Sequence, residues 1–346
     1  MRRMTKTAAL LGAAVLALTA CGSPEETDDG DGGGPTESEV MVGMAYDVGG
    51  RGDQSFNDAA AAGLDQAAEE FGFETQESEA ADGEPESARE ERLRTFADAG
   101  YDPIIAVGFA YSASVAKVAK EYPEVHFAII DDEVAMGDNI ANLVFAEEEG
   151  SFLVGAAAAL KTETDQIGFV GGVNTPLIKK FEAGYIAGAE QVNPDIEIES
   201  TYLTQPPDFS GFGDPAKGLT AAQGMYDGGA DIVYHAAGGS GGGVFEAAAE
   251  SGNLAIGVDS DQYVTADPSV QDVILTSMLK KLDVAVFEYL TQVDEGTFPS
   301  GVERYDLEDD GVGYSTSGGK IDDITDQLDD FKQQIIDGDI EVPTTP

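Results

Sequence analysis

The fold is decided by the stretch "VMVGMAYDVGGRGDQSFNDAAAAGL", residues 40–64, because its hydrophobic pattern changes in the middle. The first seven residues form a short apolar run, and a glycine-rich turn follows it. From Ser55 onward small apolar residues recur at a helical spacing, which predicts a helix over 55–71. A short strand, a turn and a helix form the repeating unit of a parallel sheet, so the stretch predicts an α/β protein.

The same unit recurs along the rest of the chain. Short runs rich in Val and Ile alternate with helical patterns, as expected of strands buried on both faces of a parallel sheet. We expect strands at residues 40–46, 103–107, 125–130, 140–145, 166–170, 196–203, 231–235, 254–258 and 273–275. We expect helices at residues 55–71, 86–99, 112–121, 147–161, 177–192, 215–226, 244–251 and 279–293. One compact doubly wound sheet usually carries fewer strands, so two doubly wound lobes are predicted.

The boundary between the lobes is expected where the pattern restarts, shortly before "QIGFVGG". We predict an N-terminal lobe made of residues 40–147 with 263–294, and a C-terminal lobe made of residues 148–262 with 295–342. In doubly wound sheets ligands bind beyond the carboxyl ends of the strands. A cleft between two such lobes would collect the loops that follow the strands, so these loops are the first place to look for a site.

The first residues have the pattern of a bacterial lipoprotein signal. Positive charges at Arg2, Arg3 and Lys6 precede an apolar run that is too short to span a membrane, and small residues then lead to a cysteine. We therefore expect residues 1–21 to be a signal peptide, with Cys21 at its cleavage point as the site of lipid attachment.

Residues 22–39 are rich in Gly, Pro, Asp, Glu, Ser and Thr, a composition that cannot bury enough apolar surface to fold. We interpret them as an acidic flexible tether. Cys21 is the only cysteine in the chain, so no intramolecular disulfide is expected. With the lipid bilayer as a partner through Cys21, the expected location is the outer face of the cytoplasmic membrane.

The charge balance excludes one class of partner. The chain has 66 Asp and Glu against 18 Lys and Arg, a formal net charge of -48. Nucleic-acid binding needs a basic face, so nucleic acid is not an expected partner. The charge excess also adds self-repulsion that salt would screen, which leads to the hypothesis of a saline habitat.

The loop after the first predicted strand carries the first candidate site residues. Asp47 follows the strand directly, and Ser55 and Asn57 flank Phe56 at the start of the helix. Helix capping would explain Ser55 or Asp53, and a core position would explain Phe56. The functional alternative is that Phe56 stacks on a flat ring while Asn57, which has both a donor and an acceptor, binds the edge of that ring.

Polar residues also follow other predicted strands. Asp131 ends the run "FAIID" and Asp259 ends the run "AIGVD". A carboxylate in this place can accept hydrogen bonds from the neighbouring hydroxyls of a sugar, and a solvated turn is the alternative for Asp131. Lys280 lies at the predicted start of a helix, where it would either reach the cleft or belong to a solvated helix face.

Signals for catalysis or metal binding are few. The two histidines, His126 and His235, are far apart, so the sequence has no HExxH motif or clustered zinc site. The turn "HAAGGSGGG" lacks the lysine of a GxxxxGK[ST] motif and the spacing of a GxGxxG motif. A hydrolase with paired carboxylates stays open, because carboxylates are abundant here. We expect no cofactor, no metal and no enzymatic activity.

Several longer motifs, in a fixed order between residues 40 and 286, resemble the basic membrane protein family of solute-binding lipoproteins, which includes purine nucleoside receptors. The motifs are "YDVGGRGDQSFNDAA", "YPEVHFAIID", "NLVFAEEEGSFLVGAAAA", "IGFVGG", "FEAGYIAGA", "ADIVYHAAGGSGGGVFEAA", "IGVDSDQ" and "SMLKKLDVAV". The resemblance implies a type I periplasmic-binding-protein fold, in which crossing strands join two α/β lobes. It also implies an ABC importer for nucleosides, with permease and ATPase subunits as partners.

The resemblance also implies residue roles. Phe56 would stack on the base, and Asn57 and Asp131 would hydrogen-bond it. Asp259 would hold the ribose hydroxyls, with Lys280 on the ribose side.

Further residues of the cleft follow from the same motifs. Asp47 and Gly238 fall in segments that line it, and the second ring against the base is left open between Phe212 and Tyr234. The expected function is binding of a nucleoside, a purine nucleoside first, by a monomer. The alternatives are a surface sensor without transport and a nucleoside hydrolase.

Overall fold

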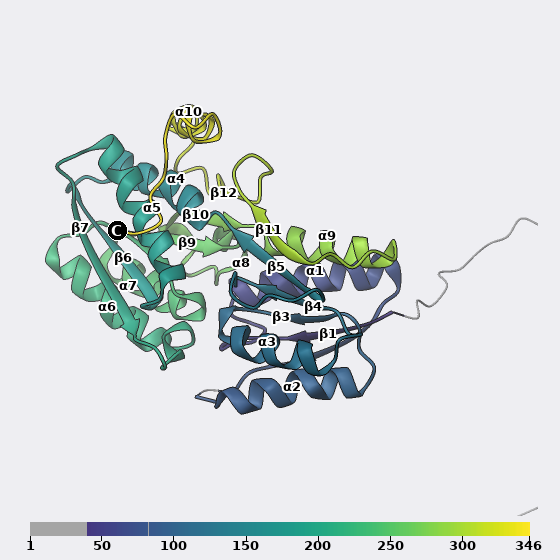
Figure 1. Cartoon of the computed structure of the whole chain (residues 1–346). Coiled ribbons are helices and arrows are strands. Elements are labelled where there is room, and N and C mark those ends of the chain that lie inside the picture. The colour runs from purple at the N-terminus through teal and green to yellow at the C-terminus, as the bar shows by residue number, and fades with distance from the viewer. Residues whose placement is uncertain (1–39, 82) are drawn as a thin grey trace, which may run out of the picture. The chain divides into compact units, whose positions relative to one another are not determined.

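The computed structural model describes residues 40–81 and 83–346, which form two lobes, each built around a six-stranded sheet (Figure 1). The first sheet has the order β11-β5-β4-β3-β1-β2, and its strand pairs are all parallel. Its helices pack in two pairs, α1 with α9 and α2 with α3. The elements are β1 (Met41–Ala45), α1 (Phe56–Phe71), β2 (Glu74–Ser78), α2 (Glu86–Asp98), β3 (Ile104–Ala106), α3 (Ser112–Glu121), β4 (Phe127–Ile130), β5 (Ile140–Phe145), α9 (Leu282–Asp294) and β11 (Gly301–Tyr305).

The second sheet has the order β12-β10-β9-β8-β6-β7 and is parallel except for the pair of β10 and β12. Here α4 packs with α5 and with α10, and α6 packs with α7. The elements are α4 (Glu147–Lys161), β6 (Gln166–Val173), α5 (Pro176–Val192), β7 (Glu197–Thr204), α6 (Pro215–Gly228), β8 (Ile232–Ala236), α7 (Gly241–Ser251), β9 (Leu254–Asp259), α8 (Gln262–Thr265), β10 (Ile274–Lys280), β12 (Val312–Tyr314) and α10 (Thr325–Ile336). The predicted α/β fold of two mostly parallel lobes is confirmed.

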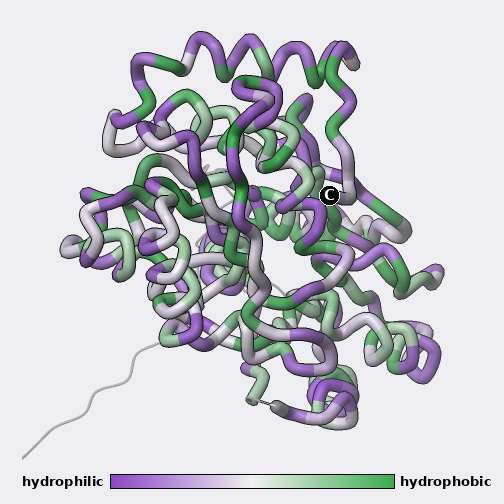
Figure 2. The backbone as a smooth tube through the Cα atoms, turned by 90° about the vertical axis from the view of Figure 1, so that its left-hand side faces the viewer, coloured by the Kyte–Doolittle hydropathy of each residue, from purple (hydrophilic) through white to green (hydrophobic). Residues whose placement is uncertain are grey.

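The core lies between the sheets and their helices. Every residue of β3, β4 and β5 is buried, as expected for parallel strands that lie between two layers of helices. Along the helices hydrophilic and hydrophobic segments alternate (Figure 2), which is typical of helices that place one side on a sheet. The short Val- and Ile-rich runs of the sequence therefore formed strands, and the segments of mixed polarity formed the helices that cover them.

The chain crosses between the lobes at three places. β5 ends at Phe145 and α4 of the second lobe begins two residues later. β10 of the second lobe ends at Lys280, and α9 of the first lobe begins at Leu282. The third crossing joins β11 to β12. Two of the crossings therefore carry charged residues, Glu147 and Lys280, close to the carboxyl ends of the strands.

The predicted lobe boundaries differ from the strand pairing in two places. β10 was expected in the N-terminal lobe but pairs with β9 and β12 of the second sheet. β11 was expected in the C-terminal lobe but pairs with β5 of the first sheet. The pattern of a strand gives its buried faces and not its neighbours, so the sequence could not assign these strands to a sheet.

Lys280 was predicted at the start of a helix and is instead the last residue of β10. A short apolar run has no period that separates a buried strand from a buried helix, which explains this error. The polar edge strand β2 was missed because none of its five residues is buried, so it has no apolar run. The elements β11, β12 and α10 were also not predicted.

Glycines bring α4 and α5 unusually close together. A Cβ atom on Gly184 would lie 2.0 Å from the carbonyl oxygen of Glu148, and one on Gly188 would lie 1.9 Å from that of Phe152. From the other side, a Cβ atom on Gly155 would lie 2.1 Å from the carbonyl oxygen of Tyr185. Only glycine permits this approach, so the three glycines fix where the first turn of α4 lies.

The predicted signal peptide, Cys21 and the tether lie outside the described residues. Within residues 40–81 and 83–346, the helices all fall short of the length and apolar character needed to cross a membrane.

Candidate functional site

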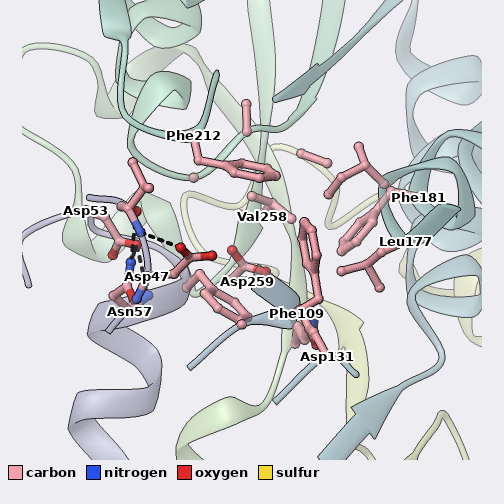
Figure 3. Close-up of a pocket in the computed structure, with 18 residues that line it drawn as sticks. Asp47, Asp53, Asn57, Phe109, Asp131, Leu177, Phe181, Phe212, Val258 and Asp259 are labelled. Atoms are coloured by element: carbon pink, nitrogen blue, oxygen red, sulfur yellow. Dashed lines mark hydrogen bonds and ion pairs between the residues drawn. The ribbon is translucent and has the colours of Figure 1, made fainter. Parts of the chain in front are cut away.

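A pocket lies where the carboxyl ends of the strands of both lobes meet (Figure 3). It holds about 540 Å³ of space between the side chains, its open mouth included. The residues that line it are Asp47, Val48, Asp53, Phe56, Asn57, Gly108, Phe109, Asp131, Leu177, Ile178, Phe181, Phe212, Ala236, Ala237, Gly238, Val258, Asp259 and Lys280. The lining combines aromatic rings with four aspartates and one lysine.

The start of α1 is held by Asp53. Its carboxylate accepts hydrogen bonds from the backbone N–H groups of Ser55 (2.9 Å), Asn57 (2.8 Å) and Asp58 (3.1 Å). Ser55 occupies the N-cap position, but its side chain makes no capping hydrogen bond. The cap is therefore Asp53, which leaves the Ser55 hydroxyl available for another partner.

Asn57 connects the polar residues on this side of the pocket. Its Nδ2 donates to Asp53 Oδ2 (3.0 Å), and its Oδ1 accepts from the backbone N–H of Asp47 (3.2 Å). Asp47 Oδ1 accepts from the backbone N–H of Val48 (2.8 Å). Burial raises the pKa of Asp47 to about 6, and it likewise raises the pKa of Asp53 to about 6. Both carboxylates are thus held in place and are costly to keep charged without a further donor.

Aromatic rings reach the pocket from both lobes. Phe56 lies at the start of α1 in the first lobe, and Phe212 ends a short 3-10 turn (Ser210–Phe212) of the second lobe. Phe109 of the first lobe contacts Phe212 edge to face, with ring centres 6.3 Å apart, and Phe181 comes from α5. Figure 3 shows Phe109 and Phe181 on the side of the pocket away from Asp53 and Asn57, with Phe212 above the middle of the pocket. The pocket therefore has an aromatic side and a polar side.

Lys280 and Asp131 form a buried ion pair between the lobes. Lys280 Nζ lies 2.6 Å from Asp131 Oδ2 and 3.1 Å from Glu147 Oε1, and the lysine side chain is 1% exposed. Burial by itself lowers the pKa of Lys280, but nearby carboxylates, Asp131 first, raise it above its usual value. Burial raises the pKa of Asp131, and Lys280 opposes that rise. The lysine therefore stays charged inside the pocket.

Asp259 also touches both lobes. It ends β9, and its Oδ2 accepts a hydrogen bond of 2.5 Å from the hydroxyl of Ser55. Next to it, the side chains of Ser260 and Gln262 donate to the backbone oxygen of Gln54, at 2.9 and 3.0 Å. Burial raises the pKa of Asp259. These contacts tie the start of α1 to the end of β9.

With this geometry in view, comparison with known proteins identifies the family. The sequence model of the family described as "ABC transporter substrate-binding protein PnrA-like" matches residues 40–346. The chain belongs to this family. The predicted resemblance to basic membrane proteins is thereby confirmed, and the chain is a solute-binding protein of the ABC-transporter type.

Individual proteins are similar to the chain over nearly their whole length. A Listeria innocua protein named "CD4+ T-cell-stimulating antigen" is 37% identical over 352 residues, 95% of each chain. A Lactococcus lactis protein named "ABC transporter nucleoside-binding protein BmpA" is 32% identical over 363 residues, 99% of each chain. A crystal structure of an ABC transporter solute-binding protein from Aeropyrum pernix has a TM-score of 0.77 at 31% identity, covering 88% of this chain and 93% of that one.

The pocket brings together most of the residues that the sequence singled out as candidate ligand-binding residues. Those that line it are Asp47, Phe56, Asn57, Asp131, Phe212, Gly238, Asp259 and Lys280. Ser55 lies behind Asp259, to which it donates. Tyr234 is fully buried in the core of the second lobe, and its hydroxyl lies 3.2 Å from that of Ser151. Of the two candidates for a second ring, Phe212 is thus the one at the pocket.

Sequence reasoning missed Phe109 and Phe181. Phe109 follows β3 in a strand-end loop, so its position was a usable signal. Phe181 lies in α5 at a spacing typical of a core residue, so no sequence signal marked it. His235 is buried with its pKa lowered to about 3 by burial, and it does not line the pocket. Within the described residues no group of acidic, histidine or cysteine side chains is placed to hold a metal ion.

Proposed function

We propose that this chain is a membrane-anchored, extracytoplasmic receptor that binds a nucleoside, in first place a purine nucleoside, and delivers it to an ABC importer. The observation that carries the proposal is that Phe56 and Phe212, from opposite lobes, line one pocket together with the strand-end carboxylates Asp131 and Asp259. A flat base with a sugar matches this combination of rings and acceptors. The name of the Lactococcus lactis relative supports the same ligand class.

The base is expected between the rings of Phe56 and Phe212. Stacking of a base on an aromatic side chain contributes about 1–3 kcal/mol, so Phe56 and Phe212 would supply most of the affinity. Asn57 and Asp131 would bind the edge of the base, where a purine offers both donors and acceptors. A larger base covers more of both rings, which favours a purine over a pyrimidine.

The ribose is expected beside Asp259 and Lys280. A carboxylate can accept two hydrogen bonds from neighbouring hydroxyls, and the ammonium group of Lys280 can donate to a sugar oxygen. Asp47 and Gly238 would complete the wall, the glycine by letting the ligand approach the backbone. A sugar without these hydroxyls would leave hydrogen-bonding capacity of Asp259 and Lys280 unused in a buried site and would bind more weakly.

Delivery to an importer would use closure of the lobes. A ligand that contacts both lobes stabilises the closed state, because these contacts exist only there. We propose that lipid at Cys21 keeps the monomeric receptor at the outer face of the membrane, beside the permease and its ATPase. An importer encoded next to this gene would favour transport over sensing.

The test is calorimetric titration, at high salt, of the purified protein without residues 1–21. The ligands are adenosine, guanosine, inosine, cytidine, uridine and free ribose. We expect saturable binding of at least one purine nucleoside and no heat from ribose. No binding of any nucleoside would overturn the proposed ligand and leave the fold and family standing.

We further propose that the protein is not an enzyme. A nucleoside hydrolase would release free base, which chromatography detects after prolonged incubation with inosine or adenosine. We expect the nucleosides to be recovered intact. Release of base that depends on the protein and is lost in Asp259→Ala would instead identify a hydrolase.

A further inference from the structure

Five charged side chains form a row of alternating sign from the pocket to the exposed side chain of Glu133. Lys280 Nζ lies 2.6 Å from Asp131 and 3.1 Å from Glu147. Lys180 Nζ lies 3.6 Å from Glu147 and 3.6 Å from Glu133. We call these five residues the charge row. Glu147 stands in its middle and is the residue that both lysines share.

The charge row passes from one lobe to the other and back. Asp131 and Glu133 follow β4 of the first lobe, whereas Lys280, Glu147 and Lys180 come from β10, α4 and α5, elements of the second lobe. Two of the ion pairs therefore join the lobes. The segment 131–133 is held from the second lobe by two lysines that have one carboxylate between them.

Glu147 is buried with no role apart from these lysines. Its side chain is 1% exposed, and in the described part of the chain its two oxygens form ion pairs with Lys280 and Lys180 but have no hydrogen-bond partner. A buried carboxylate is costly unless it is paired. As the first residue of α4 it lies where a helix favours negative charge, and the close contact of α5 with the Glu148 carbonyl fixes that turn. Glu147 is thus a rigid anion placed between two cations.

Lys280 depends on this anion for its direction. An ammonium group has three N–H donors, and one of them donates to Asp131 at 2.6 Å. Glu147 Oε1 lies 3.1 Å from Nζ as an ion-pair partner without a hydrogen bond. The rings of Phe56, Phe145 and Phe181 surround Nζ at 5.0–5.5 Å and accept no ordinary hydrogen bond. N–H donors of Lys280 are therefore left for a ligand in the pocket.

We propose that Glu147 is a positioning residue for ligand binding. It keeps the ammonium group of Lys280 at the pocket and that of Lys180 near Glu133. Both lysines can then form ion pairs with segment 131–133 of the first lobe when the lobes are closed. Glu147 does not line the pocket and acts through the two lysines. The inference rests on the proposed function, because a nucleoside is the ligand used to test it.

The test is a double-mutant cycle with Glu147→Gln and Lys280→Met, measured by calorimetry and stopped flow with the purine nucleoside that binds the wild-type protein most tightly. We expect Glu147→Gln to weaken binding about tenfold, mainly through faster dissociation, because the closed state loses the carboxylate that positions Lys280 and Lys180. In the Lys280→Met background the same change should cost less than about threefold. Glu147→Asp should recover part of the affinity.

Glu182→Gln is the matched control. Glu182 is also buried in the second lobe, but its carboxylate accepts from the hydroxyl of Tyr202 and lies outside the charge row. Glu182→Gln should leave the dissociation constant of the nucleoside within about twofold of wild type. The Lys180 side chain is 21% exposed and does not line the pocket. Lys180→Gln should raise the dissociation rate of the nucleoside about threefold. This variant tests the role of the charge row if Glu147→Gln does not fold.

The outcomes separate the two proposals. If the wild-type protein binds no nucleoside, both the proposed function and the role of Glu147 are overturned. If it binds and Glu147→Gln binds equally well, or if the losses from Glu147→Gln and Lys280→Met simply multiply, only the role of Glu147 fails. An unchanged dissociation rate in Lys180→Gln also contradicts the proposed ion pairing between the charge row and segment 131–133.

Discussion

Single residues at this site adopt backbone conformations that most side chains avoid. Asp131 and Asp259 have φ values of 64° and 66°, and Gln54 has a φ of 55°. Aspartate tolerates the left-handed region better than most residues, and such strain persists only where surrounding structure holds it. At each of the two aspartates the strained residue carries a contact between the lobes. These backbone conformations therefore direct the carboxylates of Asp131 and Asp259 into the cleft.

The ring of Phe212 is expected to carry a large part of nucleoside affinity. Phe212→Ala should weaken binding by about 10- to 100-fold, because stacking contributes about 1–3 kcal/mol per base. Tyr234→Phe should leave affinity unchanged, since Tyr234 is buried outside the pocket, and should lower the free energy of unfolding by about 1 kcal/mol through the lost Ser151 contact. Calorimetry and urea unfolding measure the two effects. An affinity that Phe212→Ala leaves unchanged would show that Phe212 is not the second ring.

Asp47 is expected to lower stability at neutral pH. Its pKa is raised from 3.8 to about 6 by burial. Between about pH 4 and pH 6 the folded state therefore holds a proton that the unfolded state has lost. The cost is absent below pH 4, grows as pH rises from about 4 to 6, and is complete at pH 7. Asp47→Asn should therefore raise the free energy of unfolding at pH 7 by up to about 3 kcal/mol, a gain that disappears toward pH 4.

Urea unfolding of wild type and Asp47→Asn at pH 4, 5, 6 and 7 measures this difference. The same variant should bind nucleoside more weakly, because it loses an acceptor at the pocket. Equal pH slopes for the two proteins would mean that Asp47 does not titrate in this range.

At the scale of elements, the placement of the site depends on how α4 and α5 pack. Gly155, Gly184 and Gly188 let the backbones approach, and this sets the first turn of α4 with Glu147. On the other lobe, Asp53 caps α1 and so sets Phe56 and Asn57. The pocket is thus assembled from helix starts whose positions are fixed by close packing and by one cap.

Gly188→Ala tests this packing. The added methyl group would meet the carbonyl oxygen of Phe152, a backbone atom that cannot move alone, so the variant should lose about 1–3 kcal/mol of unfolding free energy. Gly224→Ala in α6 is the matched control, because its Cβ atom meets no neighbour within 4 Å. It should gain about 0.5–1 kcal/mol. Thermal unfolding of both variants gives the answer, and equal melting temperatures would contradict the close contact.

At the scale of the whole molecule, charge is the dominant property. The net charge of -48 places strong self-repulsion on the folded chain. The pocket follows the same trend, with four aspartates and one lysine among its lining residues. A neutral nucleoside suits such a pocket better than an anion does.

Salt should therefore stabilise the protein. Raising NaCl from 0.1 to 2 M shortens the screening length from about 10 Å to below about 3 Å, and we expect the melting temperature to rise by at least about 5 °C. Sucrose stabilises proteins without screening charge and serves as the control. A melting temperature that does not change with NaCl would refute the hypothesis of adaptation to a saline habitat.

The sequence by itself determined the fold class and most of the candidate site. Buried parallel strands read as Val- and Ile-rich runs, and the candidate ligand residues follow them directly, so Asp47, Asp131 and Asp259 could be predicted at the pocket from local pattern alone. Only the tertiary structure decided the rest. The assignment of β10 and β11 to their sheets, the choice of Phe212 over Tyr234, the bond of Ser55 to Asp259, and the place of Glu147 between two lysines all depend on contacts between distant segments. Local periodicity reports which face of an element is buried, and it carries no information about which partner buries it.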